Sequence, residues 1–175
     1  PRVLFWVAPA VARAAMDTGA ARHRLDMVEY GEALEQRLGG SREVIRTTIQ
    51  NAKTDPKRIV FPEGTQEKIL RASKILIDEG IAHPIVLGSE LDIREKMEGL
   101  RLEIPGLMIE DPAASSNLDD YTEEFFRLRE RKGVTRAEAE KSALNPNVFG
   151  AMMVHMNDAD GLVSGLTQHY PETLR

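Results

Sequence analysis

One arginine in this chain combines a charged side chain with a position on an apolar helix face. The segment 117–131 has helical periodicity, and one face carries four apolar side chains, Leu118, Tyr121, Phe125 and Leu128. Arg129 lies about 20° from Leu118 on this wheel, whereas Arg127 and Arg131 lie about 180° and 220° away and are expected at the surface. An inward arginine needs an anionic partner, because a buried charge without one is costly. Either a carboxylate of the chain or a bound phosphate or carboxylate can supply it, and the planar guanidinium suits phosphate well.

A serine followed by a glycine marks a second candidate site at the end of a predicted strand. Ser164-Gly165 follows the apolar run 161–163, and open α/β sheets bind ligands at the carboxyl ends of their strands. A small polar residue and a glycine there allow backbone N–H groups to approach an anion. The alternative is a tight turn that requires glycine. Gly64-Thr65-Gln66 has the same form after Phe61, and there the structural turn is the preferred interpretation.

Several other chemistry-bearing patterns are missing from the sequence. It contains no G-x-G-x-x-G, P-loop, H-E-x-x-H or G-x-S-x-G motif. The four histidines lack metal-ligand spacing, and we expect surface or supporting positions for His23, His83, His155 and His169. Asp158 and Asp160 could form a carboxylate pair, but aspartate favours turns, so we expect them in the turn before the next strand. The sequence therefore predicts no metal site.

Composition and charge restrict the class of protein. Hydrophobic residues make up 42% and charged residues 29%, as in a globular protein. The 23 basic and 28 acidic residues give a net charge of −5, which argues against nucleic acid as a partner. No apolar run reaches the ~20 residues that cross a bilayer, so no membrane partner is expected. The absence of cysteine excludes disulfides and agrees with a reducing compartment, so we expect a cytoplasmic protein.

Both ends of the sequence indicate a piece of a longer enzyme. There is no initiator Met, and 171–175 has the proline and acid of a first helical turn without the rest of the helix. The apolar run 3–8 is similar to the core of a signal peptide. Pro9 fits the first position of a helix and Gly19 the residue after its end, which favours a helix over 9–18. We therefore expect a segment that is not a complete catalyst by itself.

Helical patterns come first along the chain, and an alternation of strands and helices follows. We expect helices over 9–18, 27–38 and 41–53, with Gly39-Gly40 breaking the chain and Ser41 capping the third. Thr54-Asp55-Pro56 separates this part from the rest. Predicted strands then lie at 58–61, 84–88, 107–109 and 161–163. Predicted helices alternate with them, one through 69–76 that ends at Gly80 and others at 89–98, 117–131, 136–143 and 146–156.

This order of elements indicates an α/β fold with a parallel sheet and crossover helices. One helix start is marked in the sequence itself, because Thr135 and Glu138 form a T-x-x-E capping box before the helix 136–143.

Four motifs resemble the phosphate acetyltransferase family. They are RIVFPEG at 58–64, FRLRERKGVT at 126–135, FGAMMV at 149–154 and DADGLVSG at 158–165, and the resemblance runs from about residue 42 to the end. The stretch 1–19 resembles the end of the catalytic part of bacterial malic enzymes, and the large NADP-dependent malic enzymes join both parts in one chain. The resemblance implies a helical malic-enzyme end with a linker at 1–40, and the first half of a phosphotransacetylase-like domain at 41–175.

The family pattern also implies the residues that bind ligand. Its L-R-x-x-K-G-V-T arginine, which helps bind phosphate or CoA, falls on Arg129, and the arginine opening the helix after serine-glycine falls on Arg175. With Ser164 and Gly165 these form the predicted ligand site. True acetyltransferases continue after S-G with a histidine-serine-threonine pattern, whereas 166–172 reads LTQHYPE, as in malic enzymes, which argues against acetyl transfer. The family's catalytic serine, arginine and aspartate fall beyond Arg175, so no catalytic residue is expected in this segment.

The resemblance implies a two-lobed α/β fold like that of isocitrate and isopropylmalate dehydrogenases, incomplete here because the later half supplies strands to both lobes. It implies a homo-oligomeric parent enzyme that converts malate and NADP to pyruvate, carbon dioxide and NADPH with Mg or Mn. The segment itself is expected to bind neither NADP nor metal. Three functions stay open for it: a regulatory domain that binds acetyl-CoA, a working phosphate acetyltransferase, and an oligomerisation module.

Overall fold

The computed structural model of the chain describes residues 2–167, and the side chains of all of these except 2–6, 32, 35–43 and 46. Two compact units are present, one ending at Asn51 and the other beginning at Ala52. The predicted division into 1–40 and 41–175 stays a prediction.

The first unit contains helix α1 (Arg2–Asp17) and most of helix α2 (Met27–Thr54). Two expectations about these helices are wrong. Pro9 lies inside α1 rather than at its first position. Gly39-Gly40 does not end one helix with Ser41 capping the next, because α2 continues through all three residues. Each glycine costs about 1 kcal/mol relative to alanine in a helix, but unlike proline it keeps its N–H, so the helical hydrogen bonds can continue.

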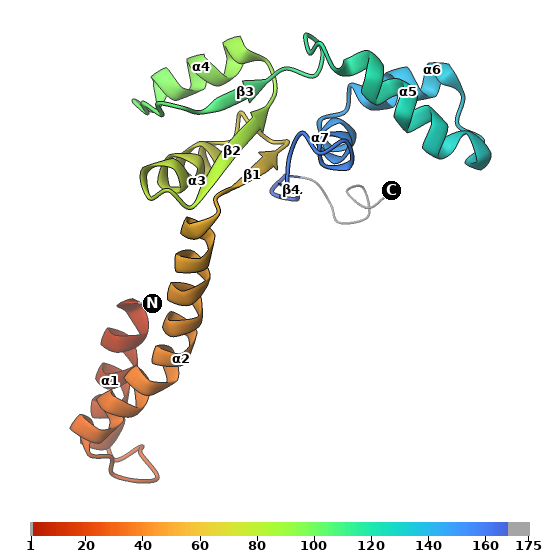
Figure 1. The fold of residues 1–175 in the computed structure, drawn as a ribbon. Helices are drawn as coiled ribbons and strands as arrows, with labels where there is room; N and C mark the ends of the chain where they lie inside the picture. The colour runs from red at the N-terminus through yellow and green to blue at the C-terminus, as the bar shows by residue number, and fades with distance from the viewer. Residues whose placement is uncertain (1, 168–175) are drawn as a thin grey trace. The chain divides into compact units, whose positions relative to one another are not determined.

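The second unit is built on a four-stranded parallel sheet (Figure 1). Its strands are β1 (Lys57–Phe61), β2 (Ala82–Leu87), β3 (Met108–Glu110) and β4 (Gly161–Leu162), in the order β3-β2-β1-β4. β4 pairs with β1 so that Gly161 lies opposite Ile59 and Leu162 opposite Val60. The predicted parallel sheet is confirmed, and each strand agrees with its expected position within two residues.

The crossover helices are α3 (Glu67–Asp78), α4 (Glu90–Gly99), α5 (Leu118–Arg129), α6 (Arg136–Ala143) and α7 (Pro146–His155), with a 3-10 turn η1 (Glu130–Lys132) after α5. The predicted capping box is present at the start of α6. Thr135 Oγ1 accepts from Glu138 N at 3.3 Å, and the Glu138 carboxylate accepts from Thr135 N at 2.8 Å. α7 begins in a related way, since Asn145 caps it and Pro146 occupies its first position.

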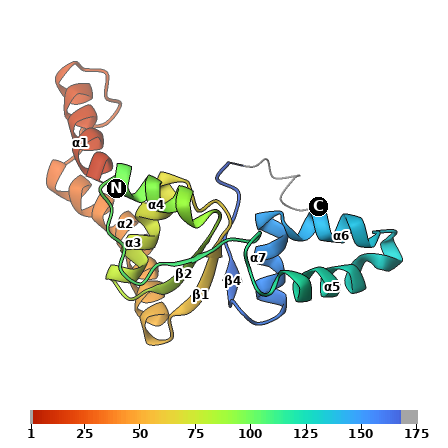
Figure 2. The ribbon, with the colours of Figure 1, turned by 90° about the horizontal axis from the view of Figure 1, so that it is seen from above.

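Both faces of the sheet are covered by helices. Successive side chains of a strand point to opposite faces, so neighbouring residues enter different clusters. Val60 packs with Ile85, Leu87 and the helices α5 and α7. The next residue, Phe61, packs with Val86 and the helices α3 and α4. Figure 2 shows α3 and α4 on one side of the strands and α5 and α7 on the other. The unit is therefore an α/β layer structure, as the alternating pattern predicts.

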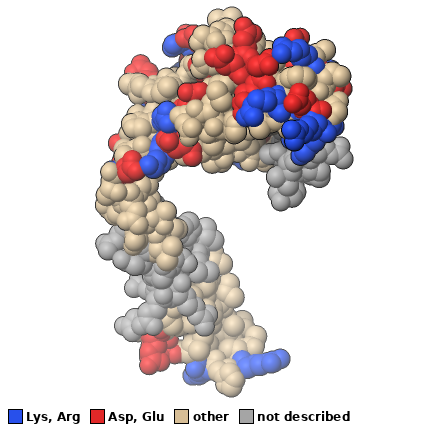
Figure 3. Space-filling view, turned by 45° about the vertical axis from the view of Figure 1, so that its right-hand side comes forward, with Lys and Arg blue, Asp and Glu red and all other residues tan. Residues whose placement is uncertain are grey.

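Basic and acidic side chains of the second unit are interspersed on the face that Figure 3 shows. Several form exposed pairs within one helix, such as Arg71 with Glu67 at 2.8 Å and Lys74 with Asp78 at 3.0 Å. Exposed pairs of this kind contribute little to stability. No helix within residues 2–167 is both long and apolar enough to span a membrane.

Candidate functional site

The two strand-end turns singled out in the sequence lie at the same edge of the sheet. β1 and β4 are parallel neighbours, so the residues after Phe61 and after Leu162 emerge side by side. Gly64 donates its N–H to the Leu87 carbonyl of β2 at 3.1 Å. A Cβ at Gly64 would lie 2.5 Å from that same oxygen, so the turn requires glycine for close backbone approach. The geometry therefore supports a tight turn that requires glycine at this position, rather than an anion site.

The second turn is held by side chains from two other segments. Ser164 donates its hydroxyl to Asn147 Oδ1 at 2.6 Å, in the first turn of α7. Gly165 has φ +109°, a conformation that other residues rarely adopt. The N–H groups of Leu166 and Thr167 donate to the Glu63 carboxylate at 3.0 and 2.6 Å. The N–H groups beside the predicted anion site therefore hold a carboxylate of the chain itself.

Glu63 was not singled out as a functional residue by the sequence, although it lies in the FPEG motif. Burial alone would raise the pKa of its carboxyl, but hydrogen bonds from Thr167, Leu166 and Gly165 hold that pKa below its ordinary value. The group is therefore ionised at neutral pH. The available signal was an acidic residue at the end of a predicted strand, where polar side chains meet in parallel sheets.

Arg129 lies at the end of α5 and is half-buried, whereas Arg127 and Arg131 are exposed, as predicted. Its guanidinium carbon lies 5.9 Å from the centroid of the Phe125 ring, within the range of a cation–π contact. One part of the helical-wheel prediction is wrong, because Leu128 is 44% exposed. Leu128 is the penultimate residue of α5, and the turn η1 begins two residues later.

A pocket of about 550 Å³ opens beside Arg129. It is lined by Phe125, Arg129, Lys132, Gly133, Val134, Glu138 and Ser142. Arg129 and Lys132 supply two positive charges, and Ser142 supplies a hydroxyl. Glu138 is the acidic lining residue, but its carboxylate accepts hydrogen bonds from Thr135, which lower its pKa. With the Glu138 carboxylate counted, the lining carries two positive charges and one negative charge, and its excess positive charge and the Ser142 hydroxyl can accept an oxyanion such as phosphate.

The structure places the predicted ligand residues in two locations. Ser164 and Gly165 share the turn after β4, while Arg129 lies in the pocket between α5 and α6, and neither Ser164 nor Gly165 is among the residues that line that pocket. Arg175 lies outside the described residues. Lys132 and Ser142 are further lining residues that the sequence did not single out, although Lys132 belongs to the same basic run as Arg129.

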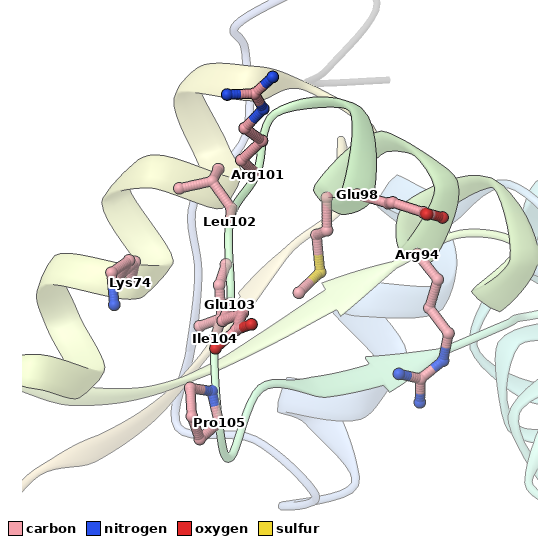
Figure 4. A pocket seen from close by; sticks show the side chains of 9 residues that line it. Lys74, Arg94, Glu98, Arg101, Leu102, Glu103, Ile104 and Pro105 are labelled. Carbon is pink, nitrogen blue, oxygen red and sulfur yellow. The ribbon is translucent and has the colours of Figure 1, made fainter.

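A hollow of about 750 Å³ lies between α3, α4 and the loop that leads to β3 (Figure 4). Its three basic side chains do not converge. In Figure 4 the side chains of Lys74, Arg94 and Arg101 point in different directions. Lys74 and Arg94 also pair with carboxylates of their own helices, Asp78 and Glu90. We assign no ligand to this hollow.

The two aspartates and His155 have structural partners, and His169 lies outside the described residues. Tyr121 donates its hydroxyl to Asp158 at 2.5 Å, and Asp160 pairs with Arg58 at 3.1 Å. Both aspartates lie in the segment that leads into β4, which confirms the turn interpretation. His155 lies 2.8 Å from Glu124. Among residues 2–167, no group of three or more His, Cys, Asp or Glu side chains is placed to hold a metal ion.

Comparison with known proteins assigns the part of the chain that carries both turns and the Arg129 pocket. A family profile described as "Phosphate acetyl/butaryl transferase" matches residues 43–175. The chain belongs to this family. The phosphate acetyltransferase of Thermoanaerobacterium thermosaccharolyticum is 39% identical over 132 residues, which are 75% of this chain and 40% of that protein. A phosphotransacetylase structure from Streptococcus pyogenes superposes with a TM-score of 0.67 at 32% identity, over 75% of this chain and 41% of that one.

A second kind of relative extends over nearly the whole chain. The NADP-dependent malic enzyme of Escherichia coli K12 is 32% identical over 177 aligned residues, which are 98% of this chain. The chain spans only 23% of the length of that enzyme. These similarities are those of a phosphotransacetylase-like region in a hybrid malic enzyme.

Proposed function

We propose that this family member is the phosphotransacetylase-like region of an NADP-dependent malic enzyme and that it binds acetyl-CoA as a regulatory ligand. The observation that carries the proposal is the extent of the two alignments. The acetyltransferase relative aligns with 75% of the chain, whereas the malic enzyme aligns with 98%. The additional similarity therefore includes residues that precede the family match at 43–175.

The pocket beside Arg129 supports the choice of ligand. CoA carries several phosphate oxyanions, and the Arg129 guanidinium and the Lys132 ammonium can pair with them. Ser164, Gly165 and Arg175 complete the proposed ligand set. The parent enzyme would oxidise and decarboxylate malate with NADP and Mg or Mn elsewhere in the polypeptide. The described residues offer no metal-ligand cluster. Regulation follows if acetyl-CoA binds two states of the parent with different affinities.

The test uses the full-length parent. Malate-dependent reduction of NADP, with NAD measured in parallel, is followed across a series of acetyl-CoA concentrations. In Arg129→Ala the concentration for half-maximal effect should rise about tenfold, because a charge-assisted hydrogen bond of about 1.4 kcal/mol is lost. Arg131→Ala is the matched control, because Arg131 is exposed on the adjoining turn and should leave the response unchanged. An unchanged response in Arg129→Ala removes Arg129 from the ligand site.

Acetyl transfer is the second candidate, and the family match favours it. The same preparation is given acetyl phosphate and CoA, and thioester formation is followed. We expect none, because LTQHYPE at 166–172 departs from the acetyltransferase pattern. Thioester formation that depends on acetyl phosphate would establish a working transferase in place of a regulatory domain.

A further inference from the structure

The carboxylate of Glu63 joins the two strand ends that frame the proposed ligand turn. Its Oε2 accepts from Leu166 N at 3.0 Å, and its Oε1 accepts from both the N–H and the hydroxyl of Thr167 at 2.6 Å. Glu63 follows β1 by two residues, and its partners follow β4 by four and five. A single side chain thus ties together segments more than one hundred positions apart in the sequence.

The contact has the form of an anion held by consecutive backbone amides. The left-handed conformation of Gly165, at φ +109°, turns the chain so that the following N–H groups face one acceptor. The pKa of Glu63 lies below its ordinary value for the reason given above, so the acceptor is charged. Hydrogen bonds to a charged acceptor are about twice as strong as neutral ones.

The other side of the same turn is also fixed. Ser164 uses its hydroxyl proton in the hydrogen bond to Asn147 Oδ1, which leaves the hydroxyl oxygen as an acceptor. Ser164 is therefore anchored to α7 and the residues after Gly165 are anchored to the β1 end. With both sides tied, Ser164 and Gly165 have a defined position at the carboxyl edge of the sheet.

We propose that Glu63 is a positioning residue that holds the turn Ser164–Thr167 in its ligand-binding form without touching the ligand itself. The proposal rests on the proposed function, which places Ser164 and Gly165 in the acetyl-CoA site. In this arrangement the N–H groups of Leu166 and Thr167 donate to Glu63, and Arg129 and Lys132 bind the phosphates of the ligand.

The test is direct acetyl-CoA binding to the full-length protein by calorimetry. Glu63→Gln keeps the shape of the side chain but removes its charge and one acceptor, and it turns an NH₂ group toward a donor. We expect about tenfold weaker binding and faster amide hydrogen exchange at Leu166 and Thr167. Thr167→Val should weaken binding by a smaller factor, and Thr167→Ser should restore it because the hydroxyl returns. Glu67→Gln is the control, because Glu67 pairs with the exposed Arg71 of its own helix, away from the turn Ser164–Thr167.

The outcomes separate the two proposals. Equal binding by wild type and Glu63→Gln would overturn the positioning role alone, and tighter binding would show that Glu63 competes with the ligand. If wild type binds no acetyl-CoA, there is no such site to position, and the regulatory function fails together with it. The unfolding midpoint of each variant is recorded. If Glu63→Gln does not fold, acetyl-CoA binding by Thr167→Val tests the positioning role instead.

Discussion

At the scale of single residues, the second unit depends on a small number of side chains that connect distant segments. Arg58 in β1 and Asp160 before β4 form one such connection. The Asp160 carboxylate accepts from the Arg58 backbone N at 2.8 Å, from Nε at 3.2 Å and from Nη2 at 3.1 Å. Asp160 also donates its own N–H to the Arg58 carbonyl at 2.8 Å. The pairing of the short strand β4 with β1 is extended by these bonds.

This pair predicts a pH dependence of stability. The hydrogen bonds from Arg58 lower the pKa of Asp160 to about 2. Because the folded state holds the carboxyl charged more strongly than the unfolded state, the contribution is complete above about pH 4 and disappears as the pH falls toward 2. Asp160→Asn should therefore be less stable than wild type at pH 7, with a gap that narrows between pH 4 and pH 2.

Urea unfolding at a series of pH values measures this gap. Glu103→Gln is the control, since Glu103 is exposed on the loop before β3 and its substitution also removes one carboxylate. A gap for Asp160→Asn that stays constant from pH 7 to pH 2 would contradict the assignment.

At the scale of elements, the packing of α7 on the sheet depends on a glycine. A Cβ at Gly150 would lie 2.9 Å from Leu162 Cδ1 and 3.1 Å from Val60 Cγ1. Overpacking of this kind costs about 1–3 kcal/mol, and alanine recovers up to about 1 kcal/mol of helix propensity. We expect Gly150→Ala to lower the free energy of unfolding by about 1 kcal/mol net.

Gly99 offers a matched comparison in urea unfolding. It is the last residue of α4, and a Cβ there would meet nothing within 4 Å. Gly99→Ala should not destabilise the protein. If Gly150→Ala is as stable as Gly99→Ala, the contact between α7 and β4 is looser than the structure shows.

At the scale of the whole molecule, both hydrophobic clusters among the described residues lie in the second unit. Both hydrophobic clusters consist of residues between Ile59 and Leu162. A chain that begins at Ala52 should therefore retain a cooperative unfolding transition, with a midpoint within a few degrees of the whole chain. Circular dichroism during heating measures it. Leu70→Ala removes a fully buried side chain and should destabilise both chains by about 2–5 kcal/mol. Loss of cooperativity in the shorter chain would show that residues 1–51 contribute to the core.

Local patterns in the sequence predicted the order and type of the elements in the second unit. Apolar runs such as 58–61 predicted buried strands, and the Thr135–Glu138 pair predicted the start of α6, because these signals act within a few residues. The inward position of Arg129 followed from helical periodicity in the same way. The sequence predicted less well where a local penalty was small, as at Gly39-Gly40, whose cost does not end a helix.

The identity of the distant groups that meet depends on the three-dimensional fold. Glu63 and Thr167 are separated by 104 positions, and Arg58 and Asp160 by 102, so neither hydrogen bond has a local sequence signal. They form because parallel pairing of β1 and β4 brings the strand ends to one edge of the sheet. The sequence predicted an anionic ligand at Ser164-Gly165, with a tight turn as the alternative, and the fold brings the carboxylate of Glu63 to the N–H groups that follow. Local patterns specify which groups need partners, and chain topology determines which partners come within reach.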